Sequence, residues 1–471
     1  MSAINVLGID LGASSGKGII GAFDGWRLSL EEIHRFPNRP VTVLSGFYWD
    51  ILSLFCEVKA ALIKSKAAGC KLDSMAIDAW SQSFALIDKN GNMLANPRHY
   101  WDSRADAIYA SALEKIPEYD LFIKTGMRAD KAYILFHVLA ALANERHLIE
   151  LTDKLLFIPD LLNFFLTGQI FADPTIASVS MLYDQSRKTW SQDIMERYGI
   201  PGVLPPIIPC GSLVGGLLKN VSGELGIGAL PVFSVAAHDT ASAYAAAPFA
   251  DGNTVVISCG TWTSIGIDTD EPIISREAFD LSFCNEGGYD RNLFIKNLIG
   301  MWIIQECIRE WRNDGFERDY DYFNRCASES GFDSLIDVDS PEFTSPGNMS
   351  GKIRDYLLKS GQPAPESREE TYRCVMLSLA VKYKAVIEDL ETVAARRFDR
   401  INIIGGGAKN GFLCEMTARL TGKAVYAGPY EATVIGNIAA QLIALGEFKG
   451  IGEAREAIRQ SFTPEFYQGN R

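Results

Sequence analysis

The chain has 471 residues, of which 47% are hydrophobic and 22% charged. This composition is typical of a folded protein and excludes a disordered chain, and the length suits two or three domains with cores of their own. With 45 Lys and Arg against 58 Asp and Glu, the formal net charge is −13. That balance argues against a nucleic-acid binder, because such proteins usually carry an excess of basic residues.

The sequence indicates neither a membrane nor an oxidising compartment. No apolar run reaches the roughly 18 residues of a bilayer-spanning helix, and the first ten residues have no basic segment, so we expect no signal peptide. The nine cysteines are scattered and include no C-x-x-C pair, which favours free thiols over disulfides or a zinc site. We therefore expect a cytoplasmic protein that binds neither membrane nor nucleic acid.

The N-terminal half alternates patterns of strand and helix. Apolar runs on either side of a turn of small residues predict a hairpin, and a third strand follows it. Next come a helix, a strand with a hairpin turn at Lys89–Asn92, and a mainly helical region that stops at Gly168. The predicted ranges are 6–10 and 19–23 for the hairpin, 26–36 for the third strand, 50–68 for the helix, 75–88 for the strand and 103–170 for the helical region.

The C-terminal half repeats part of this pattern. After a Pro- and Gly-rich tract at 201–229, residues 230–247 read as a buried strand that enters a helix, and 254–268 as a second strand–turn–strand. We infer two halves built on related units, with a boundary at Ala247–Pro248. A helix over 370–398, a strand over 401–407 and a helix over 411–420 follow, and this alternation indicates α/β domains.

The first of three glycine clusters joins the strands of the first hairpin and runs from Asp10 to Lys17 as D-L-G-A-S-S-G-K. Its small residues let the backbone approach a phosphate, and its amides, hydroxyls and Lys17 are all donors. It is not a P-loop, because three residues rather than four separate Gly12 from Gly16. An ordinary glycine-rich turn is the alternative interpretation.

The second and third clusters lie in the second half. Ser258 to Trp262 forms a similar turn, and the two turns could clamp a polyphosphate between two domains. Gly405 to Asn410 joins a strand to a helix as a nucleotide-binding turn does, although Asn410 replaces the last glycine of the dinucleotide pattern. The alternative is an ordinary glycine-rich hairpin turn for the second cluster and a tight connection between strand and helix for the third.

Two aspartates follow apolar strands. Asp239, in H-D-T, comes where α/β folds place ligand sites, and it could take the proton of a substrate hydroxyl. The alternative is an N-cap for the helix that follows. Asp10 could orient hydrated Mg²⁺ or merely stabilise its turn.

Together, these motifs resemble the FGGY carbohydrate kinases, which belong to the actin- and Hsp70-like superfamily. The matching runs are D-L-G-A-S-S-G-K, H-D-T-A-S-A, S-C-G-T-W, N-E-G-G at Asn285–Gly288, G-G-G-A-K-N and the run at 428–437. The resemblance implies two RNase H-like α/β domains with an active-site cleft between them. Residues 1–247 would hold the sugar site and the catalytic base, and residues 248–471 the nucleotide site.

The resemblance also implies roles for single residues. Asp239 would be the general base and Asp10 would hold Mg²⁺. ATP would be bound by Ala13, Ser14, Ser15, Gly16, Lys17, Gly260, Thr261, Gln305, Gly406 and Asn410. The sugar would be faced by Ser81, Gln82, Ser83, His238, Thr240 and Asn297.

The implied reaction is ATP- and Mg²⁺-dependent in-line phosphorylation of a small-molecule ketose, by a monomer or a homodimer. The branch of the family that forms 1-phosphates of 6-deoxy ketoses is the most similar, but it carries T-W-G-V-D-F where this chain has Ala79 to Phe84. Because its acidic residue is Ser83 here, an L-fuculose kinase or another ketose or pentulose kinase stays open. A non-catalytic sugar or nucleotide sensor on the same fold is the alternative from another class, and the presence of Asp239 argues against it.

Overall fold

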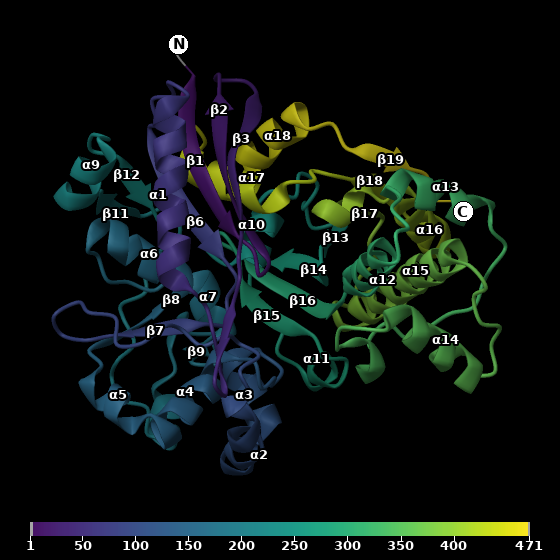
Figure 1. Ribbon diagram of the computed structural model, residues 1–471, viewed down its shortest axis with the longest axis horizontal. Helices are drawn as coiled ribbons and strands as arrows, with labels where there is room; N and C mark the ends of the chain where they lie inside the picture. The colour runs from purple at the N-terminus through teal and green to yellow at the C-terminus, as the bar shows by residue number, and fades with distance from the viewer. Residues whose placement is uncertain (1–2, 470–471) are drawn as a thin grey trace. The chain divides into compact units, whose positions relative to one another are not determined.

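A computed structural model describes residues 3–469 of the chain, which form two compact units that each contain a sheet (Figure 1). The first unit comprises the chain up to Ala246, Asp268–Phe294 and Thr433–Ser461, and the second comprises Ala247–Ile267, Ile295–Ala432 and the chain from Phe462. The first break lies one residue from the expected boundary. Because two later segments return to the first unit, however, one cut does not describe the division. The separate sugar and nucleotide roles of 1–247 and 248–471 stay a prediction.

The first unit is built on a six-stranded sheet in the order β11-β12-β6-β1-β2-β3. Its central strand β1 pairs antiparallel with β2, which confirms the predicted hairpin, and parallel with β6, with Asp10 opposite Asp78. The predicted third strand is β3, which pairs antiparallel with β2. The bounds are β1 (Ile4–Leu11), β2 (Ser15–Phe23), β3 (Leu28–Pro37), β6 (Ser74–Ala79), β11 (Leu213–Gly216) and β12 (Pro231–Phe233).

Residues 75–88 do not form the single strand that their pattern predicted. The sheet strand β6 ends at Ala79, and β7 (Phe84–Ile87) pairs instead with β8 (Lys154–Phe157). Between the two strands Trp80 packs on Trp49, with ring centroids 4.0 Å apart. The turn at 89–92 leads to a single bridge, Ile87–Met93, rather than to a second hairpin strand. Packing of residues 80–83 thus overrides their strand propensity.

Most of the rest of this unit is helical. The predicted helix over 50–68 is α1 (Ile51–Ala67), whose first turn is capped by Asp50 through a 3.2 Å bond from the Ser53 amide. The helical region ends as expected at Gly168, which adopts φ 73° after α6 (Ile158–Thr167). The other helices are α2 (Asp106–Lys115), α3 (Glu118–Thr125), α4 (Ile134–Asn144), α5 (Arg146–Leu151), α7 (Pro174–Val179), α8 (Gln192–Tyr198), α9 (Lys219–Leu225), α10 (Asp239–Ala245), α11 (Arg276–Asp280), α17 (Ala432–Ala444) and α18 (Ile451–Ser461).

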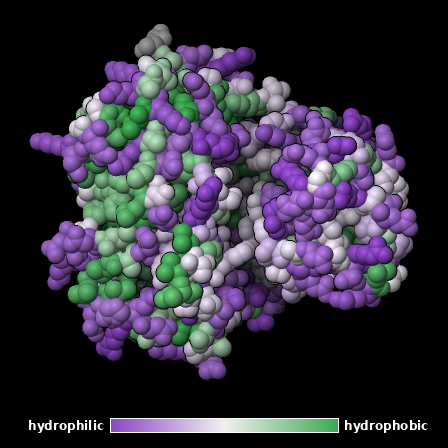
Figure 2. Space-filling model, viewed as in Figure 1, coloured by the Kyte–Doolittle hydropathy of each residue, from purple (hydrophilic) through white to green (hydrophobic). Residues whose placement is uncertain are grey.

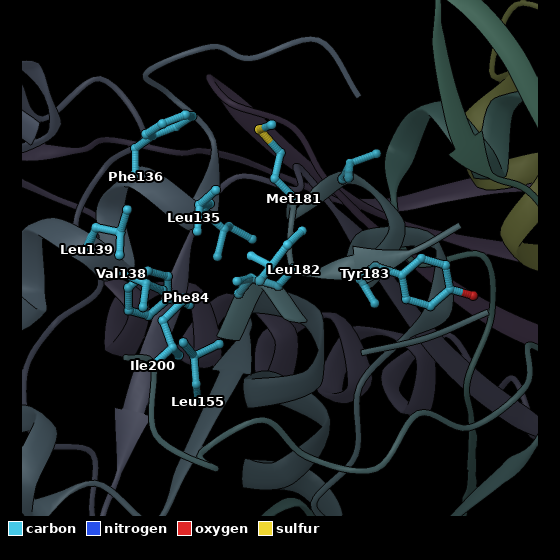
Figure 3. Packing of buried hydrophobic residues seen from close by; sticks show 14 of the residues in the cluster. Phe84, Leu135, Phe136, Val138, Leu139, Leu155, Met181, Leu182, Tyr183 and Ile200 are labelled. Carbon is cyan, nitrogen blue, oxygen red and sulfur yellow. The ribbon is translucent and has the colours of Figure 1, made fainter. Parts of the chain in front are cut away.

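Two hydrophobic clusters contribute to the core of the first unit. One joins the sheet to α1 and α6 through residues such as Ile9, Leu62 and Leu161. The other fills the helical region, where Phe136 and Leu182 are wholly buried (Figure 3). Short elements complete this unit: β4 (Val41–Val43), β5 (Gly46–Tyr48), η1 (Ser103–Ala105), β9 (Tyr183–Asp184) and β10 (Thr189–Trp190).

The second sheet repeats the arrangement of the first. Its order is β15-β16-β14-β13-β17-β18-β19, and the chain passes between the units within β14 and β16. The strand β13 pairs antiparallel with β14 and parallel with β17, as β1 does with β2 and β6, which confirms the predicted similarity of the two hairpins. The bounds are β13 (Thr254–Cys259), β14 (Trp262–Thr269), β15 (Cys284–Gly287), β16 (Asn292–Ile299), β17 (Arg400–Ile404), β18 (Ala424–Ala427) and β19 (Glu465–Tyr467).

The long helix of the second unit, α15 (Arg368–Val393), ends five residues before the predicted 398. The chain breaks there because Ala395 turns into the left-handed region, with φ 50°. The predicted strand and helix that follow are β17 and α16 (Gly411–Thr421). The remaining elements are α12 (Trp302–Asn313), α13 (Tyr320–Glu329), η2 (Pro341–Phe343), α14 (Met349–Lys359) and η3 (Gly406–Lys409).

The polarity of the surface and the state of the cysteines agree with what the composition predicted. Figure 2 shows polar side chains over much of the viewed face, with apolar side chains in separate patches. All nine cysteines are free thiols, as expected. Within residues 3–469, no helix combines the length and apolar character needed to cross a membrane.

A close backbone contact within the first unit packs α10 against α17. Gly436 of α17 lies so near the backbone of Ser242 that a Cβ would come within 2.6 Å of its carbonyl carbon. The Ser242 hydroxyl also donates to the Thr433 carbonyl at 2.8 Å. Only glycine permits this approach, because a backbone cannot move aside as a side chain can.

We therefore expect Gly436→Ala to lower the free energy of unfolding by about 1–3 kcal/mol, the usual cost of overpacking, despite the higher helix propensity of alanine. The matched control is Gly452→Ala in α18, where a Cβ would meet no atom within 4 Å; it should raise the free energy by up to about 1 kcal/mol. Urea unfolding measures both. Equal stability of Gly436→Ala and the wild type would show that the contact is not limiting.

Candidate active site

Three aspartates gather at the carboxyl ends of neighbouring strands in the first unit. Asp10 and Asp78 are direct partners in the parallel β1–β6 register. The next residue of β6, Ala79, donates to the Ala237 carbonyl at 2.8 Å and pairs with His238, so that Asp239 follows at the same edge. We call Asp10, Asp78 and Asp239 the acidic edge, and such edges are where α/β sheets bind ligands.

Asp78 is the most buried member of the acidic edge. Its side chain is fully buried, and Oδ2 accepts a 2.7 Å bond from Nδ2 of Asn437 on α17. Burial and the nearby charges of Asp10 and Asp239 raise its pKa well above the ordinary value. The charged form of Asp78 is therefore disfavoured. The sequence prediction missed it, although an aspartate inside an apolar strand was a signal.

Asp239 is the first residue of α10, and the N-cap position belongs to His238. The N-cap alternative for Asp239 is thus wrong. Its Oδ1 accepts from the amide and the hydroxyl of Thr240, at 2.6 and 3.3 Å. Although about a third of the side chain is exposed (36%), burial of the surrounding site raises its pKa to about 6. A carboxylate with this pKa is suited to general-base work near neutral pH.

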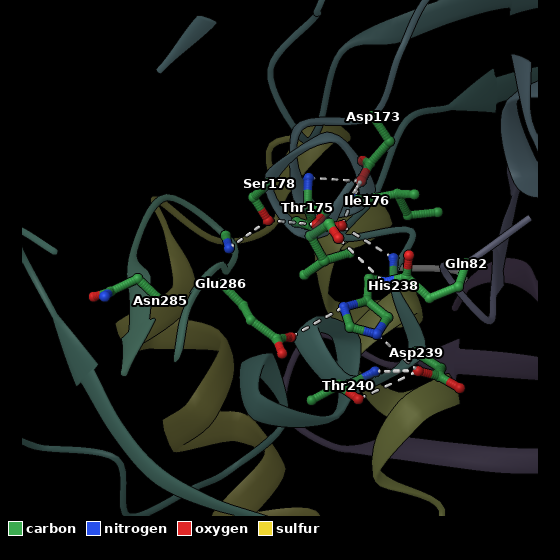
Figure 4. A network of polar contacts seen from close by, with 12 residues as sticks. Gln82, Asp173, Thr175, Ile176, Ser178, His238, Asp239, Thr240, Asn285 and Glu286 are labelled. Carbon is green, nitrogen blue, oxygen red and sulfur yellow. Dashed lines mark hydrogen bonds and ion pairs between the residues drawn. The ribbon is translucent and has the colours of Figure 1, made fainter. Parts of the chain in front are cut away.

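His238 lies between two carboxylates (Figure 4). Its Nε2 is 3.4 Å from Asp239 Oδ1, and its Nδ1 is 3.4 Å from Oε2 of Glu286 on β15. The His238 amide donates to Thr175 Oγ1 at 3.0 Å, and that hydroxyl donates in turn to the buried Asp173. Burial lowers the pKa of His238, against the opposing charge of Glu286. Sequence reasoning missed the roles of Glu286, Thr175 and Asp173, since only the fold brings them to His238.

The other residues predicted to face the sugar differ in their surroundings. Ser83 is buried and accepts a 2.9 Å bond from the Trp49 indole, while the Gln82 amide bonds the backbone of Ile134 and Val179, both at 3.2 Å. Ser81 is also buried. Asn297 is an exposed residue of β16 in the second unit. Sugar contacts by these residues stay a prediction.

The first glycine cluster forms the β1–β2 turn of the first unit. Ala13 and Ser14 are exposed at its tip, where the Gly12 amide donates to the Ser15 carbonyl at 2.9 Å. Lys17 Nζ lies 3.3 Å from Asp10 Oδ2, so the cationic donor and the carboxylate share one end of the hairpin. Gly16 is buried beneath the ring of Phe36, which leaves no space for a side chain.

The structure brings three predicted nucleotide residues of the second unit together. Gly260 and Thr261 form the β13–β14 turn, and Thr261 Oγ1 donates to Oε1 of Gln305 at 3.1 Å. An approximately 390 Å³ cavity adjoins Gln305. The sequence prediction did not include the arginines and the tyrosine that line this cavity. The lining residues are Gln305, Ile308, Arg309, Arg312, Asn313 and Tyr320.

The third glycine cluster follows β17. Gly405 adopts φ 82°, and a Cβ on Gly407 would come within 2.8 Å of the Cys259 Cβ, so tight packing against β13 requires glycine here. Gly406 is exposed. Asn410 is buried, caps α16 through the Leu413 amide at 2.9 Å and donates to the Tyr372 hydroxyl at 2.7 Å. Its structural role is clear, and its contact with a nucleotide stays a prediction.

Comparison with known families and proteins shows which proteins this chain resembles. The N-terminal domain of the FGGY family of carbohydrate kinases matches residues 5–245, and the C-terminal domain of the same family matches residues 255–445. A rhamnulokinase from Bacteroides thetaiotaomicron is 35% identical over 470 residues, which cover 98% of this chain and 95% of the relative. A rhamnulokinase from Oceanobacillus iheyensis is 36% identical over 458 residues, 97% of this chain and 96% of the relative.

Solved structures share the fold. A xylulose kinase from Lactobacillus acidophilus superposes with a TM-score of 0.80, at 17% identity. The match covers 99% of this chain and 94% of the xylulose kinase chain. A glycerol kinase from Plasmodium falciparum, solved with ADP, also superposes with a TM-score of 0.80, at 14% identity. That match covers 100% of this chain and 94% of the glycerol kinase chain. The fold is that of the sugar kinases, as the sequence resemblance implied.

The two family matches together span most of the chain, and the chain therefore belongs to the FGGY family of carbohydrate kinases. It is a phosphotransferase that uses ATP to phosphorylate a sugar.

Proposed function

We propose that the sugar is a 6-deoxy ketose, with L-rhamnulose as the first candidate, and that the product is the 1-phosphate. The similarity of the chain to rhamnulokinases over nearly its whole length supports this choice. Ser83 stands where that branch is expected to carry an acidic residue, so L-fuculose and other ketoses or pentuloses are the second candidates. The cytoplasmic location and the monomeric or homodimeric state stay predictions.

Asp239 is the proposed general base, and its placement is the observation that carries the mechanism. Oδ1 is held by Thr240, which leaves Oδ2 as the oxygen proposed to take the proton from the sugar hydroxyl while the γ-phosphoryl group moves to that hydroxyl. His238 and Thr240 would orient the sugar. Positioning and charge stabilisation supply most of the catalysis in phosphoryl transfers of this kind.

The nucleotide would be bound by donors of both glycine turns: Ala13 to Lys17 in the first unit and Gly260, Thr261 and Gln305 in the second, with Gly406 and Asn410 as further candidates. Arg309, Arg312 and Tyr320 beside Gln305 add cationic and aromatic surface suited to a nucleotide.

The residues of the acidic edge suit a magnesium ion. Asp10 offers hard carboxylate oxygens, is nearly buried and lies at the same hairpin end as Lys17, and Mg²⁺ is commonly held by one or two carboxylates, water and substrate phosphates. When bound, the ion would neutralise phosphate charge, and Asp10 is the residue proposed to hold it through water.

The sugar is tested by a coupled ADP-release assay on L-rhamnulose, L-fuculose, L-ribulose, L- and D-xylulose and glycerol. We expect the highest kcat/KM with L-rhamnulose, because the match to rhamnulokinases covers 98% of the chain. A higher value with L-fuculose or a pentulose would replace the first candidate. ADP release that no sugar stimulates would favour the sensor alternative.

Asp239→Asn keeps the size of the side chain and removes its basicity. Because general-base catalysis typically contributes about 10²–10⁴-fold, we expect kcat to fall by that range while ATP binding, measured by calorimetry, is unchanged. A variant with near-normal turnover would disprove the assignment.

The pH profile of the wild type provides a separate check. The base must be ionised to accept a proton, and the pKa of Asp239 is raised to about 6. We therefore expect kcat/KM for the sugar to be constant above this pH and to fall about tenfold per unit below it. A profile that stays flat down to the ordinary aspartate range would contradict the role of Asp239.

A further inference from the structure

The N-E-G-G motif places a buried carboxylate, that of Glu286, beside His238 of the proposed sugar site. Glu286 is 2% exposed and lies on β15, and its Oε2 is 3.4 Å from Nδ1 of His238 (Figure 4). His238 itself is 8% exposed, and its Nδ1 makes no hydrogen bond among the described residues. A carboxylate oxygen thus lies beside a ring nitrogen that has no hydrogen bond among the described residues.

The helix α7 holds both partners in place. Thr175 Oγ1 accepts the His238 amide at 3.0 Å, and Ser178 Oγ accepts the Gly287 amide at 2.7 Å. A Cβ on Gly287 would lie 3.1 Å from Ser178 Oγ, so the glycine permits the close approach. The contact between Glu286 and His238 therefore rests on two anchored backbones rather than on mobile side chains alone.

Charge decides which ring nitrogen carries the proton. Burial lowers the pKa of His238 more than the Glu286 charge raises it, so the ring is neutral at neutral pH and has a single N–H. Each ring nitrogen lies 3.4 Å from a carboxylate oxygen, but Asp239 Oδ1 already accepts two bonds from Thr240, and Glu286 is the carboxylate whose charge acts on the pKa of the ring. Glu286 therefore attracts the proton to Nδ1, and the other nitrogen is then left with a lone pair. This second nitrogen, Nε2, lies 3.4 Å from Asp239 Oδ1.

Two acceptors side by side cannot bond to each other, but each can accept a hydrogen bond from a hydroxyl group. A ligand with neighbouring hydroxyls, such as a ketose, would satisfy Nε2 and Asp239 together. Ser83, where the related branch is expected to have a carboxylate, is already bonded to Trp49. Glu286, which is 2% exposed, lies beside His238 instead.

We propose that Glu286 is a positioning residue for sugar recognition, which holds the ring proton of His238 on Nδ1 so that Nε2 accepts a hydrogen bond from a sugar hydroxyl beside the one that is phosphorylated. This inference rests on the proposed function of the site as a ketose site with Asp239 as the base.

Kinetics test the proposal through a double-mutant cycle. Glu286→Gln should raise KM for the sugar by roughly 10- to 100-fold, as loss of a partner that orients a functional histidine does, with a smaller change in kcat and none in KM for ATP. Glu286→Asp, which keeps the charge, should recover part of the loss. In a His238→Asn background, Glu286→Gln should add less than about twofold, because the two residues act as one unit.

Losses that multiply in the double variant, or an unchanged KM for the sugar in Glu286→Gln, would overturn the proposal. The matched control is Asp268→Asn, which alters another buried carboxylate of the same unit, paired with Arg455 at 2.7 Å. We expect it to lower the thermal unfolding temperature without raising KM for the sugar.

A spectroscopic test does not depend on turnover. The chain has five histidines, and the ring nitrogens of isotope-labelled His238 can be assigned by comparison with His238→Asn. We expect the Nδ1–H tautomer in the wild type at neutral pH and a mixture of tautomers in Glu286→Gln. An Nε2–H tautomer in the wild type would overturn the proposal even if the enzyme is active. Failure of every sugar in the ADP-release assay would instead refute the proposed function.

Discussion

The crowding of three carboxylates at one sheet edge, two of them buried, is the constraint on which the first unit depends. The parallel register of β1 and β6 sets Asp10 opposite Asp78, and the Ala79–His238 bridge delivers Asp239 beside them. Like charges at this spacing would repel each other strongly in a low-dielectric environment. Lys17 near Asp10 and the raised pKa of Asp78 reduce that repulsion, so the fold can bury Asp10 and Asp78 at this edge.

The helix α17 supports this arrangement through hydrogen bonds to the strands. It is largely apolar but carries Asn437 and Gln441, both fully buried. Asn437 donates to Asp78, and Gln441 bonds Ser74 at 2.7 Å and the Leu7 carbonyl at 3.1 Å. Each amide therefore meets the hydrogen-bonding needs of the sheet in a region where an unmet polar group would be costly. The same helix fixes α10, and with it Asp239, through Gly436.

Much of the local structure was readable from the sequence. Apolar runs separated by small residues predicted both hairpins, and the helix over 50–68 and the stop at Gly168 lie where their patterns placed them. The pattern failed at 75–88, because Trp80 leaves the sheet to pack on Trp49, and at the end of α15, where Ala395 takes a positive φ. In both places contacts or backbone geometry outweigh a local propensity.

The sequence by itself determined the family, the two related hairpins and the glycine turns, and it predicted Asp239 as the candidate base, because these inferences depend on residue types at short spacing. Only the tertiary structure decided which groups surround them. Asp78, Thr175 and Glu286 reach His238 and Asp239 from strands and helices far away in the chain. The register of the sheet and the packing of α7 create these contacts, and with them the pKa of Asp239 and the environment of the His238 ring. Burial and charge are properties of a place in the fold, and no spacing along the chain encodes them locally.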